Sequence, residues 1–210
     1  MQGSRKDLVR AARRLSPDAD AITLIGMTDP ERLSDPLAAL AALPRGSALI
    51  WRTYDEPPAA GMLRRLAAHA RARKCLLLLA GHPRTARRLG THGLHLPERA
   101  LSRRFENGYL LSRRDLPPSF VVTAACHSER AIVAAARAGV DAVLISPVFA
   151  TASHPGGQPL GVMRFAHLAR LARSFGMEPY ALGGIATADS IRRLSGSTAA
   201  GVAGISLLMP

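Results

Sequence analysis

Eight short, continuously apolar segments recur along the chain and are separated by longer stretches rich in Ala, Leu and Arg. The apolar segments are Ile22–Met27, Ala48–Tyr54, Cys75–Ala80, Gly93–Leu96, Phe120–Ala125, Ala142–Val148, Pro179–Leu182 and Gly201–Ser206. An uninterrupted apolar run of this length is typical of a parallel strand that is covered on both faces. The pattern therefore predicts eight strands of one parallel sheet.

The intervening stretches carry apolar residues at i, i+3 and i+4 spacing, which predicts amphipathic helices. We expect these helices at Arg32–Leu43, Pro58–Arg73, His82–Leu89, Ser102–Glu106, Glu129–Ala138, Arg164–Phe175 and Ala188–Leu194. Ser128 and Thr187 stand where they would cap two of the helices, and Gly139 stands where it would end one. The chain thus alternates between predicted strands and predicted helices.

Such an alternation folds as a closed barrel or as a doubly wound sheet. The first strand is not followed by the Gly-x-Gly-x-x-Gly fingerprint of a dinucleotide-binding sheet. We therefore expect residues 1–210 to form a single α/β domain, a (β/α)8 TIM barrel. The chain reaches Pro210 directly after the eighth strand, so the eighth helix of the pattern is missing. We expect either another subunit, in a homo-oligomer, or chain beyond Pro210 to cover that edge.

The chain has a formal net charge of +13, carried almost entirely by arginine. Most arginines lie beside Ala and Leu at helical spacing, as Arg64, Arg65, Arg71 and Arg73 do, and such residues are typical of solvated outer helix faces. Aromatic residues make up only 4% of the chain, and no basic segment is interleaved with them. We therefore expect no nucleic-acid partner.

Cysteine usage and hydropathy indicate the compartment. The two cysteines, Cys75 and Cys126, belong to no CxxC or Cys/His metal-binding pattern, which fits a reducing environment. Residues Met1–Asp20 lack the apolar core of a secretory signal. No segment approaches the roughly 18 apolar residues needed to span a bilayer. We expect a cytoplasmic protein that does not associate with membranes.

A barrel of this type places its site at the carboxyl ends of the strands and often holds phosphate after strands seven and eight. The seventh strand is followed by Gly183 and Gly184, whose backbone N–H groups can approach an anion closely. The eighth strand ends at Ile205 and Ser206, which add N–H groups and a hydroxyl. We expect these four residues to form a phosphate-binding cup.

Two other strand ends carry polar side chains. Thr151 and Ser153 follow the sixth strand and precede a Gly-rich stretch that is a candidate lid. His127 follows the fifth strand, and histidine titrates near neutral pH, so it is the candidate acid and base. Cys126 is expected in the core or in the wall of the pocket.

Six segments between Val121 and Ser206 follow one another in a distinctive order. They are Ala125–Ala131, Ala138–Val143, Ser146–Thr151, Pro159–Gly161, Ala181–Ile185 and Gly201–Ser206. In order and spacing they resemble the thiamine phosphate synthase/TenI family, whose pattern is S-x-H, E-A, G-A-D-Y-V and G-P-V-F-x-T followed by two glycine-containing strand ends. The resemblance implies the same barrel and a small phosphorylated thiazole or thiamine-related ligand.

Members of that family perform two kinds of chemistry. The synthase uses magnesium to join an aminopyrimidine pyrophosphate to a thiazole phosphate, whereas TenI-type proteins aromatise a thiazole carboxylate phosphate by moving protons. The synthase has acidic metal ligands where this chain has Gly81 and Ala100, and a lid lysine where it has His154. The resemblance therefore implies neither a metal nor a cofactor, because the carboxylates that hold magnesium are missing.

The part of the family site that remains is the thiazole-phosphate half. The resemblance implies that Thr151, Ser153, Gly183, Gly184, Ile205 and Ser206 bind the phosphorylated thiazole. Arg52, the one residue left of a Q-x-R-x-K motif, would hold a carboxylate, and His127 would move the proton. We expect a TenI-like, metal-independent thiazole tautomerase. A divergent thiamine phosphate synthase and a non-catalytic phosphate-ligand-binding or regulatory protein are the alternatives.

Overall fold

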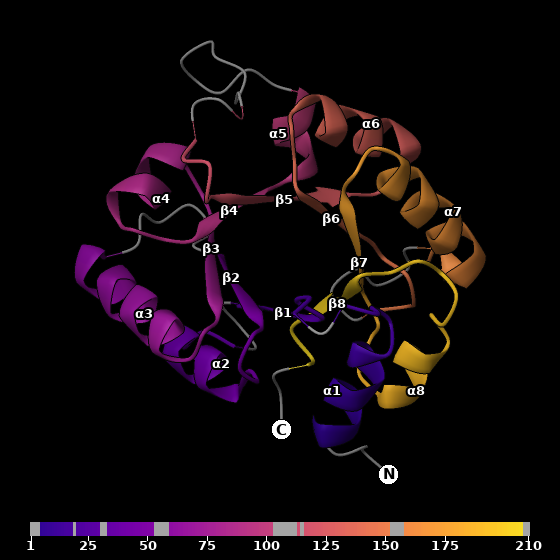
Figure 1. Ribbon diagram of the computed structural model, residues 1–210, viewed down its shortest axis with the longest axis horizontal. Helices are drawn as coiled ribbons and strands as arrows, with labels where there is room; N and C mark the ends of the chain where they lie inside the picture. The colour runs from indigo at the N-terminus through magenta and orange to yellow at the C-terminus, as the bar shows by residue number, and fades with distance from the viewer. Residues whose placement is uncertain are drawn as a thin grey trace.

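The computed structural model describes residues 5–18, 20–29, 33–52, 59–102, 113, 116–151 and 158–207. In this part of the chain eight parallel strands close into a barrel in sequence order, with β8 paired to β1. The strands are β1 (Leu24–Met27), β2 (Ala48–Arg52), β3 (Leu76–Ala80), β4 (Gly93–Leu96), β5 (Val121–Cys126), β6 (Ala142–Ile145), β7 (Glu178–Leu182) and β8 (Gly201–Gly204). The predicted (β/α)8 barrel is confirmed, and Figure 1 shows it along the barrel axis.

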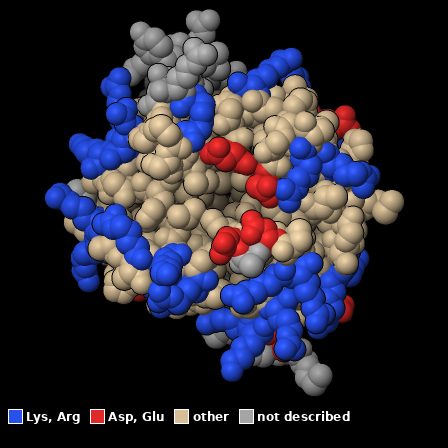
Figure 2. Space-filling view, in the orientation of Figure 1, with Lys and Arg blue, Asp and Glu red and all other residues tan. Residues whose placement is uncertain are grey.

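Eight helices in the described residues surround the barrel. They are α1 (Arg5–Arg13), α2 (Pro36–Ala42), α3 (Ala60–Ala72), α4 (Pro83–Arg88), α5 (Glu98–Ser102), α6 (Glu129–Arg137), α7 (Gly161–Ser174) and α8 (Ala188–Arg192). The strands follow one another clockwise in Figure 1. Because βαβ crossovers are right-handed, Figures 1 and 2 look onto the amino-terminal ends of the strands.

The core has two layers, which explains why the strands are apolar on both faces. Inside the barrel, side chains such as Ile50, Leu78 and Leu144 pack together. Their neighbours in the chain, such as Leu49 and Leu77, point outward and pack under the helices. Every strand therefore needs apolar residues at successive positions, as the sequence pattern indicated.

Some helices begin at other residues than the hydrophobic periodicity predicted. The helix expected from Arg32 begins instead at Pro36, because the Asp35 side chain accepts a hydrogen bond from the backbone N–H of Leu37 and proline favours the first turn. Of the short helix expected at Ser102–Glu106, only Ser102 lies within the described residues, where it ends α5, a helix that begins at Glu98.

The expectation of an edge lacking a helix is corrected by α1, a helix that the sequence analysis did not predict. Leu8, Ala11 and Ala12 form its buried face, at the i, i+3 and i+4 spacing of an amphipathic helix. This face packs against α8 and β8, at the place where a helix following β8 would lie (Figure 1). Within the described residues, the edge behind β8 is thus covered by the chain itself rather than by a second subunit.

Cys75 and Cys126 are both buried and form no disulfide. Of the helices that the structure describes, none combines the length and the hydropathy needed to cross a bilayer.

Candidate functional site

Strands β2, β4 and β5 direct polar side chains into the carboxyl-terminal mouth of the barrel. Arg52 ends β2, two positions after the inward-facing Ile50, and its backbone N–H donates to the Thr28 hydroxyl at 2.9 Å. His95 of β4 is buried, and its Nδ1 lies 2.9 Å from the Thr123 hydroxyl of β5. Burial, together with the nearby positive charge of Arg52, lowers the pKa of His95 to about 4. His95 is therefore a neutral, hydrogen-bonded part of the mouth's floor.

His127 lies directly after β5 and is oriented through one ring nitrogen. Its Nδ1 lies 2.8 Å from the backbone carbonyl oxygen of Ser146. Because a carbonyl oxygen only accepts hydrogen bonds, the neutral ring carries its proton on Nδ1 and keeps the lone pair on Nε2. The side chain is 53% exposed, so Nε2 is accessible from solvent. The residue is both tied to the end of β6 and available as a proton acceptor.

Glu98, the first residue of α5, lies beside this histidine. Its Oε2 accepts the backbone N–H of His127 at 2.8 Å and lies 3.9 Å from His127 Nε2. The sequence analysis did not predict this contact between Glu98 and His127. The position of Glu98 two residues after the end of β4 was the available signal, because functional residues of barrels gather at strand ends.

The turns after β7 and β8 lie side by side. Leu182 of β7 pairs with Ala203 of β8, so Gly183 and Gly184 leave the sheet at the same edge as Ile205 and Ser206. All four residues are at least partly exposed to solvent. The structure thus brings together the residues of the predicted cup.

The two glycines also have a packing role that the sequence did not indicate. Both have positive φ values, +97° and +69°. A Cβ on Gly183 would lie 2.9 Å from Pro147 Cα, and one on Gly184 would lie 2.5 Å from the carbonyl oxygen of Ala150. The segment after β6 therefore crosses directly over this turn, and Phe149 donates its backbone N–H to the Gly183 carbonyl at 3.1 Å. A bulky residue at Gly184 would therefore displace this segment.

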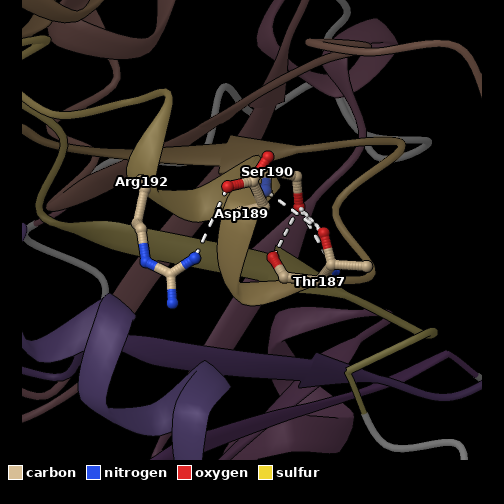
Figure 3. A network of polar contacts seen from close by, with 4 residues as sticks. All are labelled: Thr187, Asp189, Ser190 and Arg192. Atoms are coloured by element: carbon tan, nitrogen blue, oxygen red, sulfur yellow. Dashed lines mark hydrogen bonds and ion pairs between the residues drawn. The ribbon is translucent and has the colours of Figure 1, made fainter. Parts of the chain in front are cut away.

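Helix α8, which follows the glycine turn, is fixed by a reciprocal cap (Figure 3). The Thr187 hydroxyl accepts the backbone N–H of Ser190 at 3.2 Å, and the Ser190 hydroxyl accepts the backbone N–H of Thr187 at 3.2 Å. One turn further on, Arg193 lies over the Phe149 ring, 4.6 Å from its centroid. These contacts hold the segments after β6 and β7 together next to the glycine turn.

The remaining predicted residues are placed as follows. Thr151 is partly exposed at the start of the segment after β6. Ser153 and His154, together with the candidate lid through Gly157, lie outside the described residues. Burial, and then the negative charge of Glu98, raise the pKa of the Cys126 thiol to about 12, so this residue is a protonated part of the core.

The described residues do not fit a bound magnesium ion. Nowhere among them do three His, Cys, Asp or Glu side chains converge closely enough to hold a metal. Gly81, directly after β3, and Ala100 of α5 stand where the synthase motif supplies carboxylates. Magnesium requires oxygen ligands, and these positions provide none from their side chains.

Comparison with known proteins identifies the family. A family model described as thiamine monophosphate synthase matches residues 27–208. The chain belongs to the thiamine monophosphate synthase family. The predicted resemblance is confirmed, and membership connects the protein with thiamine biosynthesis and with small phosphorylated thiamine precursors as ligands.

A curated relative within the thiamine monophosphate synthase family is "Putative thiamine-phosphate synthase 2" of Aquifex aeolicus (strain VF5). It is 32% identical over 136 residues, which cover 65% of this chain and 67% of that protein. Among solved structures, thiamine phosphate pyrophosphorylase from Pyrococcus furiosus is similar with a TM-score of 0.68 at 18% identity, covering 87% of this chain and 84% of that one.

The same barrel occurs in proteins with other titles. An HpcH/HpaI aldolase from Desulfitobacterium hafniense DCB-2 is similar with a TM-score of 0.58 at 13% identity, covering 89% of this chain and 86% of that one. At such identities these similarities establish the fold alone.

Proposed function

We propose that this member of the thiamine monophosphate synthase family is a metal-independent isomerase that acts on a thiazole carboxylate phosphate. The observation that carries the proposal is the orientation of His127. Its Nδ1 is engaged by the Ser146 carbonyl, so Nε2 is the basic nitrogen at the mouth of the barrel. A single oriented base beside a carboxylate suits proton transfer, and it does not supply the metal charge that expulsion of pyrophosphate requires.

In this proposal the ligand is anchored at its phosphate by the turns after β7 and β8. Gly183, Gly184 and Ile205 would donate backbone N–H groups, and Ser206 would add its hydroxyl. Thr151 and Ser153 would contribute hydroxyls from the segment after β6. The thiazole ring would then lie over the barrel axis between the phosphate and the ends of β2 and β5.

Arg52 would bind the ring carboxylate, because a planar guanidinium matches a carboxylate with two parallel hydrogen bonds. His127 Nε2 would remove a proton from a ring carbon and return it at another ring position, so that the composition of the ligand is unchanged. Glu98 would stabilise the transient imidazolium. Phosphate binding remote from the reacting atoms would fix the ring against His127.

A divergent thiamine phosphate synthase is the second candidate. It is favoured by the name of the Aquifex relative, a putative thiamine-phosphate synthase. The two reactions differ in their products and in their need for metal. Formation of thiamine phosphate from its two precursors, with magnesium-dependent release of pyrophosphate, would replace the isomerase proposal.

The decisive variant is His127→Asn, which keeps a polar side chain of similar reach but cannot exchange a proton near neutral pH. General acid–base catalysis contributes about 10²–10⁴-fold, so we expect the isomerisation rate to fall by that factor. His167→Asn is the matched control, because His167 is an exposed histidine on α7 that pairs with Glu129 at 2.9 Å, away from the mouth. Equal rates for wild type and His127→Asn would refute the mechanism.

Binding is measured separately from turnover by titration calorimetry. We expect the His127→Asn variant to bind thiazole phosphate as tightly as the wild type, and both to bind the unphosphorylated thiazole alcohol far more weakly. A wild-type protein that binds thiazole phosphate tightly and isomerises nothing would favour the non-catalytic alternative.

A further inference from the structure

Six basic side chains from distant parts of the chain line one groove on the outside of the barrel. The groove has a volume of about 910 Å³, and its cations are Arg5, Lys6, Arg10, Arg13, Arg14 and Arg73. Helix α1 forms one wall, and the end of α2 with Arg73 forms the other. Figure 2 shows the densest gathering of Lys and Arg over the region of α1. Contrary to the expectation from the charge pattern of the sequence, we propose that this groove binds the phosphate backbone of single-stranded nucleic acid.

The arginines of α1, and Arg14 in the turn directly after it, face outward because the opposite side of the helix is buried. Leu8, Ala11 and Ala12 pack inward, which leaves Arg10, Arg13 and Arg14 exposed. In the described part of the chain none of these three arginines forms an ion pair with a carboxylate. Among the described residues, the lining of the groove includes no acidic side chain. The guanidinium groups of Arg10, Arg13 and Arg14 repel one another in the isolated protein, and a bound polyanion would neutralise them.

Arg73 is held at the groove by the backbone of the opposite wall. Its Nη2 donates to the carbonyl oxygens of Leu43 at 2.7 Å and Ala41 at 3.2 Å. This positioned guanidinium fixes one cation across from the exposed arginine side chains of α1. Guanidinium groups match phosphate oxygens with paired hydrogen bonds, so the site needs little reorganisation to engage a phosphate.

The donor chemistry of the lining favours a phosphodiester chain over an acidic peptide. Every polar side chain in the groove is a donor, and the other lining residues are apolar, including Val9 and Pro44. A peptide would bring backbone N–H groups that need acceptors, and the carbonyls of Ala41 and Leu43 already accept from Arg73. Phosphate oxygens only accept, so they match a surface made of donors.

The groove lies away from the mouth of the barrel. Arg73 and Leu43 follow the last turns of α3 and α2, at the amino-terminal end of the barrel that faces the viewer in Figures 1 and 2. The described lining of the groove includes no aromatic side chain on which bases could stack. We therefore infer binding through the backbone with little preference for base sequence, independent of the isomerase proposal.

The test compares two triple variants that each remove three positive charges. Arg10→Ala, Arg13→Ala and Arg14→Ala alter the groove, and Arg84→Ala, Arg87→Ala and Arg88→Ala alter α4, another basic surface. Alanine is the best helix former, so both helices remain favourable. Binding is measured by fluorescence anisotropy with a labelled single-stranded RNA of roughly 20 nucleotides over a range of salt concentrations.

We expect the groove variant to raise the Kd at least tenfold and to reduce the slope of log K against log salt by about 2, since each phosphate contact on a single strand contributes about 0.7. The α4 variant should change the Kd less than threefold. A lysine triple variant of the groove, which keeps the charges, should retain most of the binding. Equal weakening by the groove and α4 variants, absence of wild-type binding at low salt, or equally strong competition by polyglutamate and RNA would each overturn the proposal.

Discussion

Glu98 contacts His127 at two points, through the backbone and through the ring. Glu98 Oε2 accepts the backbone N–H of His127 at 2.8 Å, and the same oxygen lies 3.9 Å from His127 Nε2. The first contact fixes the backbone from which the imidazole projects. The second places a negative charge where an imidazolium would form during proton transfer. One side chain thus positions the candidate base and can stabilise its protonated form.

The Glu98→Gln variant separates these two contributions. Its amide oxygen can still accept the backbone N–H, but the negative charge is lost. Because Glu98 is partly exposed, the charge contributes about 0.5–1 kcal/mol, so we expect the isomerisation rate to fall about two- to fivefold. In Glu98→Ala the backbone N–H loses its acceptor as well, and the rate should fall further. Rates in both variants that match the wild type would show that the carboxylate takes no part.

The buried, neutral His95 predicts a loss of stability in acid. Its pKa is about 4 in the folded protein, below the ordinary value of 6.5, so the unfolded chain binds the proton more readily. The contribution of neutral His95 to the free energy of unfolding is complete above pH 6.5 and is lost as the pH falls toward 4. Between pH 7 and pH 5 we expect the free energy of unfolding to drop by about 2 kcal/mol through this residue.

Urea unfolding at pH 7 and pH 5 measures this effect, with His95→Gln as the non-titrating comparison. Burial also lowers the pKa of His92, so the wild type loses stability through more than one histidine. The difference in pH dependence between wild type and His95→Gln isolates the part due to His95. The same acid loss in both proteins would contradict the assignment.

Gly184→Ala should destabilise the fold more than an alanine at another positive-φ glycine. At Gly184 the new Cβ would meet the Ala150 carbonyl oxygen at 2.5 Å, whereas at Gly176, with φ +77°, it would meet nothing within 4 Å. Backbone strain alone costs about 1–2 kcal/mol, and overpacking adds about 1–3 kcal/mol. We expect losses of about 3 kcal/mol and about 1 kcal/mol, respectively, in urea unfolding. Equal losses of stability in the two variants would mean that the segment after β6 moves aside without destabilising the fold.

Thr187→Ala tests the reciprocal cap of α8 shown in Figure 3. The variant removes the acceptor for the backbone N–H of Ser190, and loss of such a cap costs about 1 kcal/mol. Ser190→Ala removes the other half of the same box. Because the two hydroxyls act together, we expect the double variant to lose less than the sum of the single losses in thermal unfolding. Additive losses would show that the two hydrogen bonds are independent.

The strands of the barrel, and which residues follow their carboxyl ends, were predictable from sequence. Segments such as Leu76–Ala80 are apolar at every position, and only a strand buried on both faces needs that pattern. Gly183, Ile205 and His127 could be assigned to the mouth because the carboxyl ends of parallel strands meet at one end of a barrel. These inferences need only local periodicity and the order of elements.

Helix ends were predicted less well than strands, because they depend on local side-chain hydrogen bonds. Helix α1 was not predicted, because its place depends on packing against distant parts of the chain. Asp35 ends the extended segment before α2 with one side-chain hydrogen bond, which periodicity does not register. Helix α1 has an amphipathic spacing, but its buried face is made mostly of alanine and its mean hydropathy is low, because most of its other residues are charged. Only the tertiary structure shows that α8 and β8 cover that face.

Contacts between residues far apart in the chain were decided by the tertiary structure alone. Glu98 and His127 belong to successive βα units, and barrel closure brings the start of α5 against the end of β5. Arg73 lies across a groove from Arg10 because α1 packs against α8 and faces the end of α2. Sequence determines such proximity only through the complete fold, because it depends on strand register, barrel closure and the side on which each helix packs.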